Sequence, residues 1–440
     1  MARETDQTRS LEEPTNMSRT NAREAQSAGE MDRSFANAGL QTLQFPTAHK
    51  TVGQGVATTP TGQIMVSATV TDASGSLCYG LARLRADGHL DTTFGQAGYV
   101  VGQYRRDVPS HGGKLSIDAS GGIWVCGLIK GTSVDYEQII ARFLPDGSPD
   151  LEFGDSQSGY KIIPMRVPSL FGAVAGSLEL AQSDQKAAAH DRLLFATSKQ
   201  GGALLTRFFL DGSDDTAFNA NGWIYITHPG VAIQLQGVTQ LNSGLILVYG
   251  KTEVTHQGWI MAFENAGQVA KSFGNDGTLL LNIRNEGTPL ESSVNGIVEQ
   301  SAQRLLLIGA AVEAAGGEKR QHAFMTGITH AGEIDPSFNG GAPVLSASTQ
   351  PQELKSWVAG FVVDDSADQR IVAVGQTSGG HRNLLTGGFL KDGAVDESFD
   401  LDGTAEIDWI AGDACLQDAS VVVLGTKNDS AQLIRLLTHS

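Results

Sequence analysis

The chain has 440 residues, of which 40% are hydrophobic, 53 are glycine and only three are cysteine. Its formal net charge of −17 disfavours a nucleic-acid backbone or an anionic membrane surface as a partner. No apolar stretch approaches the roughly 18 residues that a membrane helix needs. The cysteines show no metal-like spacing, so we expect neither a metal nor another cofactor.

The N-terminal segment is rich in Arg, Glu, Thr, Ser and Asn and contains no apolar run. Because it has almost nothing to bury, we predict a disordered tail over residues 1–29 and a single domain over residues 30–440. The tail does not have the pattern of a signal peptide. The expected location is therefore the cytoplasm, with export by a leaderless route as the alternative.

A short signature then recurs along the whole chain: usually Asp, two residues, Phe, and a glycine a few residues later. Successive phenylalanines are 59, 59, 65, 55, 65 and 61 residues apart. A regular period that fills the chain predicts a repeat architecture, which overrides the prior of two or three domains. The phenylalanines are Phe35, Phe94, Phe153, Phe218, Phe273, Phe338 and Phe399.

Each repeat shows the pattern of four short strands. In the second full repeat these are residues 114–118, 123–126, 139–144 and 160–163, separated by turn residues or polar loops. Four strands per repeat predict a propeller blade, because a helical period is absent and a β-helix coil would be shorter. We interpret each signature phenylalanine as a plug between blades. Apolar second strands, typical of strands buried on both faces, recur at residues 64–66, 193–195, 245–248, 305–308, 371–374 and 421–424.

In three repeats an arginine of the third strand precedes the signature aspartate by eight residues. Both are lost together at Ala262 and Ala270, which indicates that the two side chains touch, since losing one partner would leave the other charge unpaired. In two other repeats glycine, Gly327 or Gly388, takes the place of the third-strand arginine while the aspartate, Asp335 or Asp396, remains. There we expect the aspartate to cap its turn through backbone N–H groups. The expected pairs are Arg83 with Asp91, Arg142 with Asp150, and Arg207 with Asp215.

The two ends of the chain carry complementary parts of one repeat. The N-terminus supplies Asp32, Phe35 and a strand at residues 40–45, whereas the C-terminus supplies three strands and Arg435 at the third-strand position. We therefore predict an all-β, seven-bladed propeller of four-stranded blades. In this prediction residues 40–45 complete the last blade and remove an exposed sheet edge, and Arg435 pairs with Asp32.

The segments Leu81–Gly98, Ile140–Gly159 and Leu205–Gly222 resemble the delta-sixty repeats of bacterial β-propeller proteins. The resemblance covers residues 30–440, and its specificity comes from the sevenfold recurrence of the signature. The fifth full repeat departs from it, with Gly327 in place of the arginine and a proline, Pro336, in the signature. The resemblance implies a soluble propeller, often in surface or secreted bacterial proteins, and implies no defined activity.

Functional residues are expected in the variable loops rather than in the repeat core. In a propeller, the loops between strands two and three and the linkers into strand one lie on one face around the channel. His49, His111 and His228 occupy comparable linker positions in three repeats, and the linkers also hold Arg105, Arg284 and Trp357. The histidines could converge on the channel as metal ligands or acid–base groups, or could simply bond to backbone. The tryptophans could stack on sugars or pack in the core.

These patterns leave three functions open, and they identify no catalytic residue. The first hypothesis is a non-enzymatic binding module that recognises a protein or carbohydrate partner through its loop-bearing face. The second is a polysaccharide-acting hydrolase or lyase with a site at the channel mouth. The third is a scaffold. A propeller fold does not choose among them, because propellers host unrelated activities.

Overall fold

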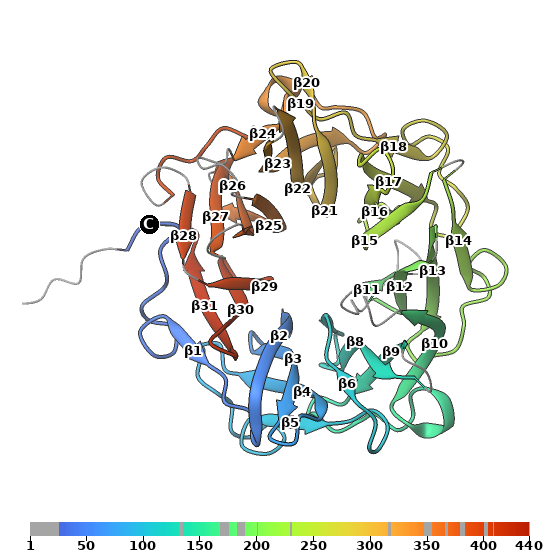
Figure 1. Ribbon diagram of the computed structural model, residues 1–440, viewed down its shortest axis with the longest axis vertical. Helices are drawn as coiled ribbons and strands as arrows, with labels where there is room; N and C mark the ends of the chain where they lie inside the picture. The colour runs from blue at the N-terminus through green and yellow to red at the C-terminus, as the bar shows by residue number, and fades with distance from the viewer. Residues whose placement is uncertain are drawn as a thin grey trace, which may run out of the picture.

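The computed structural model describes residues 26–131, 135–167, 176–182, 190–199, 201–228, 231–315, 318–346, 354–365, 368–378, 383–399, 404–407 and 409–439. The regular elements of these residues are β-strands and two short 3-10 turns, η1 (Asp155–Gln157) and η3 (Asn339–Gly341). The strands form sheets arranged in a ring around a central opening (Figure 1). Such a ring of radial sheets is a β-propeller, so the predicted all-β class is confirmed. No helix in this part of the chain is long and apolar enough to cross a membrane.

A blade is one four-stranded radial unit of this ring. In blades such as β2–β5, β11–β14 and β15–β18 the strands follow one another from the opening to the rim in chain order, so the fourth strand lies at the outer edge (Figure 1). The first blades contain β2 (Ala48–Thr58), β3 (Ile64–Asp72), β4 (Leu77–Leu84) and β5 (Tyr99–Gly102), followed by β6 (Ser110–His111), β7 (Leu115–Ile117), β8 (Ile123–Lys130), β9 (Tyr136–Phe143) and β10 (Tyr160–Val167). The next contain β11 (Ser177–Ala181), β12 (Arg192–Lys199), β13 (Gly202–Phe209) and β14 (Trp223–Ile226), followed by β15 (Ile233–Gln240), β16 (Ile246–Thr252), β17 (Gly258–Phe263) and β18 (Thr278–Leu280).

A small hairpin of β19 (Arg284–Asn285) and β20 (Thr288–Pro289) then leads into an eight-stranded sheet. This sheet consists of two four-stranded groups that are joined by a single parallel bridge between Gln321 and Leu354. The groups are β21 (Glu291–Ser301), β22 (Arg304–Ala315), β23 (Glu318–Thr329) and β24 (Val344–Ser346), and β25 (Leu354–Asp365), β26 (Asp368–Ser378), β27 (Leu384–Leu390) and β28 (Thr404–Ile407).

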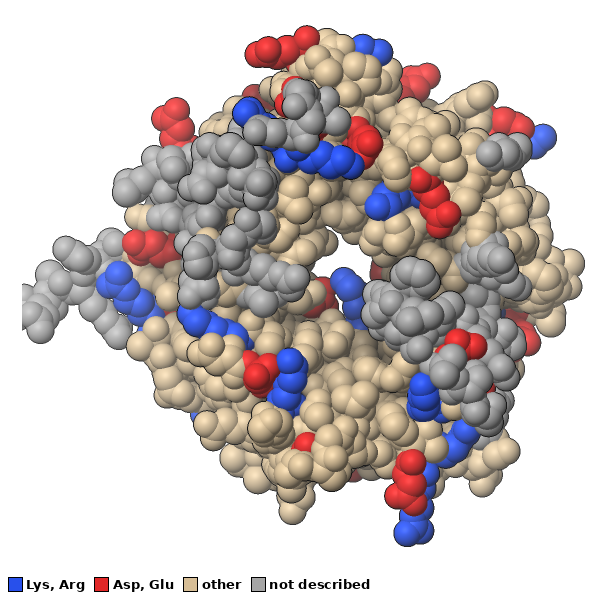
Figure 2. Space-filling view, viewed as in Figure 1, with Lys and Arg blue, Asp and Glu red and all other residues tan. Residues whose placement is uncertain are grey.

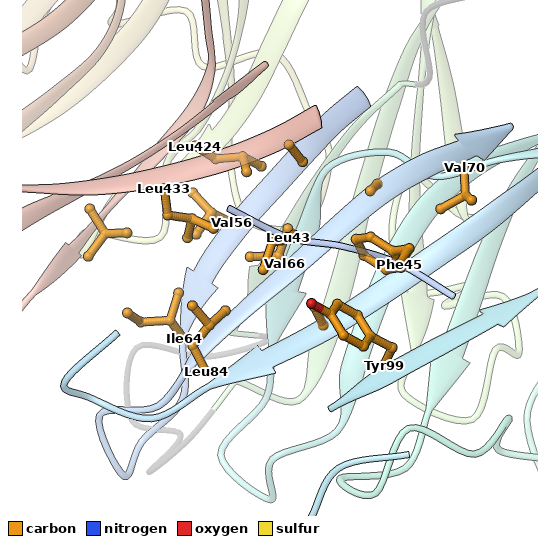
Figure 3. Close-up of a cluster of buried hydrophobic side chains, with 14 of the residues drawn as sticks. Leu43, Phe45, Val56, Ile64, Val66, Val70, Leu84, Tyr99, Leu424 and Leu433 are labelled. Atoms are coloured by element: carbon orange, nitrogen blue, oxygen red, sulfur yellow. The ribbon is translucent and has the colours of Figure 1, made fainter. Parts of the chain in front are cut away.

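The last sheet combines both ends of the chain. Its order is β1 (Leu40–Thr42), β31 (Ser430–Leu437), β30 (Ser420–Lys427) and β29 (Ile410–Gln417). Leu40 pairs with Ile434, and Leu43 and Phe45 continue into the apolar core that this sheet shares with the β2–β5 blade (Figure 3). Ala28 is also fully buried, and the N–H of Gly29 donates to Leu437 O at 2.8 Å. The packed chain therefore includes residues that we had assigned to the tail.

Five of the innermost strands share one irregularity. Their pairing with the second strand shifts by one residue in β2, β15, β21, β25 and β29, between Gly53 and Gly55 in β2 and between Ala411 and Asp413 in β29. Such a β-bulge increases local twist and re-aims side chains. The innermost strand β11 differs, because it pairs with β12 without a shift.

The predicted Arg–Asp pairs lie in contact near the signature turns. The N···O distances are 2.8 Å for Arg83–Asp91, 2.6 Å for Arg142–Asp150, 2.8 Å for Arg207–Asp215 and 2.6 Å for Arg435–Asp32. In each pair the aspartate N–H also donates to the arginine carbonyl oxygen. The same backbone bond remains at Ala270 and Ala262, at 2.9 Å, where both charged side chains are absent. Backbone pairing therefore defines the turn, and the ion pair is added to it.

Three of these arginines, Arg83, Arg207 and Arg435, also reach the next blade. Arg83 Nη1 donates to Pro145 O at 2.8 Å, and its guanidinium carbon lies 4.9 Å from the centre of the Phe94 ring. The Phe94 ring lies against Gly147 of the next blade. A side chain at position 147 would place its Cβ only 2.6 Å from this ring, and the φ of +87° at Gly147 also favours glycine. We call the Arg–Asp pair with its phenylalanine the inter-blade clamp. It joins its own turn to the turn of the neighbouring blade.

Two clamps differ from the expectation that aspartate alone caps the turn. Asp335 does accept the N–H of Ser337 at 2.9 Å, but it also forms a 2.6 Å ion pair with Arg304 of β22. Asp396 similarly meets Arg370 of β26 at 3.2 Å. In both blades the arginine has moved from the third strand to the second. The glycines left behind, Gly327 and Gly388, make room for the signature phenylalanine rings, which would clash with a Cβ there.

We predict that Arg304→Met lowers the free energy of unfolding by about 2–4 kcal/mol at pH 6, because it leaves the Asp335 carboxylate without its cation. A hydrogen bond from Ser337, together with Arg304, lowers the pKa of Asp335 to about 2. A carboxyl whose folded pKa is depressed stabilises the fold above its unfolded pKa of about 4 and loses that contribution as pH falls further. The deficit of the variant should therefore shrink between pH 4 and pH 2.

Chemical denaturation of wild type and variant at several pH values measures this difference. Arg85→Met is the matched control, because Arg85 and Asp87 form an ion pair in which both side chains are more than half exposed. Its effect should stay within about 0.5 kcal/mol. Equal effects of the two substitutions at pH 6 would contradict the role we give to the clamp.

Candidate functional site

Polar side chains from four blades gather at the central channel. Glu179 lies on the innermost strand β11, Asp413 lies on β29, and Lys114 immediately precedes β7. Tyr249 lies on the second strand β16, and its phenol covers Gly237 of the paired strand β15. A Cβ at position 237 would be 2.3 Å from the phenol oxygen of Tyr249. Glycine at that point lets the phenol reach the inner edge of the sheet. We call Lys114, Glu179, Tyr249 and Asp413 the channel group.

Lys114 spans from its own blade to the last blade of the chain. Its Nζ lies 3.1 Å from Asp413 Oδ1, while Asp413 Oδ2 accepts the N–H of Val56 at 3.1 Å. The backbone of Gly113 and Lys114 packs directly against Gly55 of β2. A side chain at position 55 would clash with it. The Lys114 side chain is 57% exposed, since it faces the channel solvent. Figure 2 shows an opening through the molecule with acidic and basic side chains at its edge.

The channel group is coupled electrostatically. The charge of Asp413 raises the pKa of Lys114 above its ordinary value. Burial raises the pKa of Glu179 to about 7, against a hydrogen bond from Thr239 that lowers it. Burial also raises the pKa of Tyr249 to about 12, with a smaller lowering by Lys114 and a smaller raising by Glu179. Glu179 still touches the channel solvent, so its carboxyl can exchange a proton near neutral pH.

The three candidate histidines do not come together. His49 is exposed on β2, His111 is half-buried on β6, and His228 is half-buried after β14, in three different blades. His111 packs edge-on against Tyr136 with ring centres 5.0 Å apart, and burial lowers its pKa. Within the described residues, no group of three His, Cys, Asp or Glu side chains could hold a metal ion. The convergence that we considered for these histidines is therefore not observed.

The other candidates are either solvated or buried. Arg105 is exposed, and Arg284 is exposed on the β19–β20 hairpin, where its Nη1 donates to Gly287 O at 2.8 Å. Of the two alternatives for Trp357, stacking on a sugar or packing in the core, the structure shows packing in the core. Its ring is fully buried and lies 6.1 Å, centre to centre, from Phe389 in the core of the β25–β28 blade. It cannot present a face to a ligand.

A cavity of about 450 Å³ lies between two described blades, over the clamp of Arg304. A second cavity of about 230 Å³ lies over the clamp of Arg83. Arg304 donates to Asp335, Gln300, Ser337 and the carbonyl of Lys391, so its guanidinium donors are already engaged. We assign these cavities to the scaffold, because the cation at their base is not available for a ligand.

The cysteines are free thiols, as expected. Cys126 is buried, and Cys78 and Cys415 are partly buried. Burial raises the pKa of the Cys126 thiol to about 12, and its Sγ lies 3.0 Å from Gly176 O. A thiol with so high a pKa is a poor nucleophile at neutral pH. It belongs to the apolar core between the β6–β10 and β11–β14 blades.

The fold and the channel define a β-propeller protein. The profile of a family described as "Domain of unknown function (DUF5122) beta-propeller" matches residues 59–94. Drosophila Semaphorin 2a has a similar structure, with a TM-score of 0.51 and 8% identity over 94% of this chain and 76% of that one. A PL25 ulvan lyase has a TM-score of 0.46 and 11% identity over 93% and 96% of the two chains. At these identities the similarity shows the fold alone.

A second semaphorin, Drosophila Semaphorin 1a extracellular domains 1–2, has a TM-score of 0.49 and 9% identity over 91% of this chain and 88% of that one. The comparison with curated protein sequences gave no match. The assignment of individual residues to a function therefore depends on the channel itself.

We predict that Glu179→Gln raises the thermal unfolding midpoint at pH 8 and leaves it nearly unchanged at pH 4. Because the folded pKa of Glu179 is raised from 4.5 to about 7, stability falls as pH rises through that window. Glutamine removes the cost of ionising the enclosed carboxyl. Thermal melts across pH 4–8 measure this, with the exposed Glu152→Gln as control. A variant less stable than wild type at every pH would contradict the prediction.

Proposed function

We propose that this protein is a binding module for a polar polymeric ligand, a glycan or a polypeptide, which engages the loop-bearing face and the mouth of the channel. The single observation that carries the proposal is the channel group. Four side chains from separate blades meet where the ring encloses solvent, and none of them belongs to the clamps. Such a set of convergent polar groups in a concave site is the usual basis of ligand recognition. The net charge of −17 further disfavours nucleic acid as the ligand.

Binding is favoured over hydrolysis by the pairing within the channel group. Glycoside hydrolysis generally requires two carboxyl groups on either side of the scissile bond. Of the two carboxyl groups here, Asp413 is occupied by Lys114 at 3.1 Å and by the Val56 N–H. Lys114 and Tyr249 can instead donate hydrogen bonds to hydroxyl, carboxylate or carbonyl groups of a ligand.

A lyase or hydrolase acting on a polysaccharide is the second candidate, and one observation favours it. The carboxyl of Glu179, with a pKa of about 7, is near Tyr249, and a group that titrates near the working pH is suited to proton transfer. In this alternative Glu179 or Tyr249 would exchange the proton and Lys114 would stabilise a developing negative charge.

A glycan array followed by a polysaccharide-degradation screen separates these functions. For a binding module we expect retention of at least one glycan class without turnover, and a loss of affinity of at least about tenfold in Lys114→Met or Tyr249→Phe. Glu152→Gln should bind like wild type. Turnover that disappears in Glu179→Gln would establish the enzyme instead. If neither assay responds and no polypeptide is captured, the channel has no ligand of these classes and the scaffold function is favoured.

The finer architecture is part of the same proposal. Seven blades are supported by seven signature turns that repeat one backbone bond, and by the separation of the eight-stranded sheet into two groups at one bridge. Closure of the ring by β1 is supported by the β1–β31 pairing and the Asp32–Arg435 ion pair. Membership of the delta-sixty repeat family is supported by the recurrence of the signature.

We predict that deleting residues 1–45 abolishes or strongly lowers cooperative thermal unfolding, because it removes β1, Asp32 and the Phe35 plug and exposes a sheet edge. Deleting residues 1–25, which removes none of the described contacts, should leave the midpoint within about 2 °C. Differential scanning calorimetry of both deletions measures this. Equal midpoints would contradict closure by the N-terminal strand.

A further inference from the structure

The outer strand β14 exposes two aromatic rings on the rim of the propeller. Trp223 is 46% exposed and Tyr225 is 41% exposed. Residues two apart on a strand point to the same face, so the two side chains leave one face of β14 from Cα atoms about 7 Å apart. The Tyr225 ring extends over Gly202 of the neighbouring strand β13. The strand is the last in its sheet, paired with β13 on one side, and it lies at the outer edge of the ring (Figure 1).

Other blades use the same repeat positions for packing. The residue after the signature glycine is Tyr99 in β5 and Tyr160 in β10, at the position of Trp223. Tyr99 is only 9% exposed and lies against Phe45, with ring centres 4.8 Å apart. Tyr160 is half-buried and lies 6.2 Å from the centre of the Tyr104 ring. In β14 the equivalent ring is turned to solvent, so the scaffold does not account for it.

The backbone beneath the two rings is fixed. Asn221 Oδ1 accepts the Trp223 N–H at 3.0 Å, and Asn219 Nδ2 donates to Trp223 O at 2.9 Å. Across the sheet, Trp223 pairs with Thr206 and Tyr225 pairs with Leu204, both of them buried. A ring held on a rigid strand loses little conformational freedom when it binds a ligand.

The surroundings of the rings are polar rather than aliphatic. Leu204 and Phe208 on the same face pack into the core shared with the β6–β10 blade, so the rings lie on the side of β14 that faces that blade. Lys161 of β10 covers Phe208 and forms a 3.1 Å ion pair with Asp214 there. Aromatic faces next to hydrogen-bonding groups match a sugar, which presents C–H groups on its ring faces and hydroxyl groups at its edges.

The exposed area separates a carbohydrate from a protein ligand. At these exposures the two side chains offer roughly 200 Å² of aromatic surface. A stable protein interface needs about 800 Å² from each partner, much of it apolar in its centre. Two exposed rings on one face of a strand are enough to contact neighbouring sugar units of a chain, and their area is too small for a protein interface.

We infer that Trp223 and Tyr225 form a stacking platform for a carbohydrate chain on the outer rim of the propeller. This site is separate from the channel group, which belongs to other strands and to the centre of the ring. The rings supply the contact with the sugar faces. Asp214, which lies beside Gly222 just before Trp223, and its ion-pair partner Lys161 supply polar groups for the hydroxyl groups. The inference stands whether or not the channel binds a ligand.

The five tryptophans make this site directly measurable. Trp124, Trp259 and Trp357 are fully buried and Trp409 is 4% exposed, so Trp223 is the one that a soluble quencher reaches most readily. Full-length protein is run in native gels that contain cellulose ether, xylan, dextran, pectate or alginate. Acrylamide quenching of tryptophan fluorescence is then measured with and without each soluble polymer.

We expect at least one polymer to retard the protein and to shield Trp223 from acrylamide. Trp223→Ala and Tyr225→Ala should each weaken the retardation at least tenfold, whereas Leu280→Ala should leave it unchanged. Leu280 is the matched control because it is 39% exposed at the position of Tyr225 in the outer strand of the next blade. The thermal midpoints of all three variants should stay near that of wild type, since the removed side chains are partly solvated.

Two results would overturn the platform. One is that no polymer retards the protein or shields Trp223, including the case in which only a polypeptide does so. The other is equal retardation of wild type and all three variants, which would place carbohydrate binding elsewhere. Lys114→Met distinguishes this site from the channel: it should retain the shielding of Trp223 even if it abolishes the binding expected at the channel mouth.

Discussion

The structure depends on the inter-blade clamp. In a ring of radial sheets the contacts between blades are mostly apolar, and apolar contacts alone do not fix how far one sheet slides along the next. The clamp supplies that constraint. Arg435 Nη1, for example, donates to Ala86 O of the following blade at 2.9 Å while its Nε and Nη2 hold Asp32. Arg304 connects to the Lys391 carbonyl in the same way, at 2.8 Å. The turns that carry such an arginine are thereby tied both to their own blade and to its neighbour.

The clamp also explains which parts of the fold could be predicted from the sequence. Where the arginine lies in the third strand, its distance to the aspartate is a constant eight residues, because one short turn connects them. Where it lies in the second strand, the separation is 31 residues for Arg304 and Asp335 but 23 for Arg192 and Asp215. The loop between strands two and three varies in length, so this second type of pair leaves no periodic pattern. Only the folded sheet places the two residues side by side.

The channel group was beyond prediction for a related reason. Its members occupy different positions within their repeats, and they come together because the ring places their blades around one axis. Gly237 makes space for the Tyr249 phenol, and Gly55 makes space for the chain at Lys114, but a single glycine in a strand carries no sign of what it admits. The histidines gave the opposite result. Their linker positions are comparable in sequence, yet comparable positions in different blades are separated by rotation around the ring.

Glu179 shows why the channel is more than a by-product of the fold. An enclosed carboxyl with a pKa of about 7 is costly to ionise at neutral pH, and the signature residues do not need it. The clamps recur in the signature turns of all blades but the one with Ala262 and Ala270, and Glu179 belongs to none of them. Natural proteins tend to tolerate unfavourable local choices at functional sites, where another requirement compensates for them. The clamps lie in the turns that join neighbouring blades, and the costly carboxyl lies by the channel. Stability and recognition therefore depend on different residues. Side chains of the channel and the rim can be substituted without removing the contacts that hold neighbouring blades together.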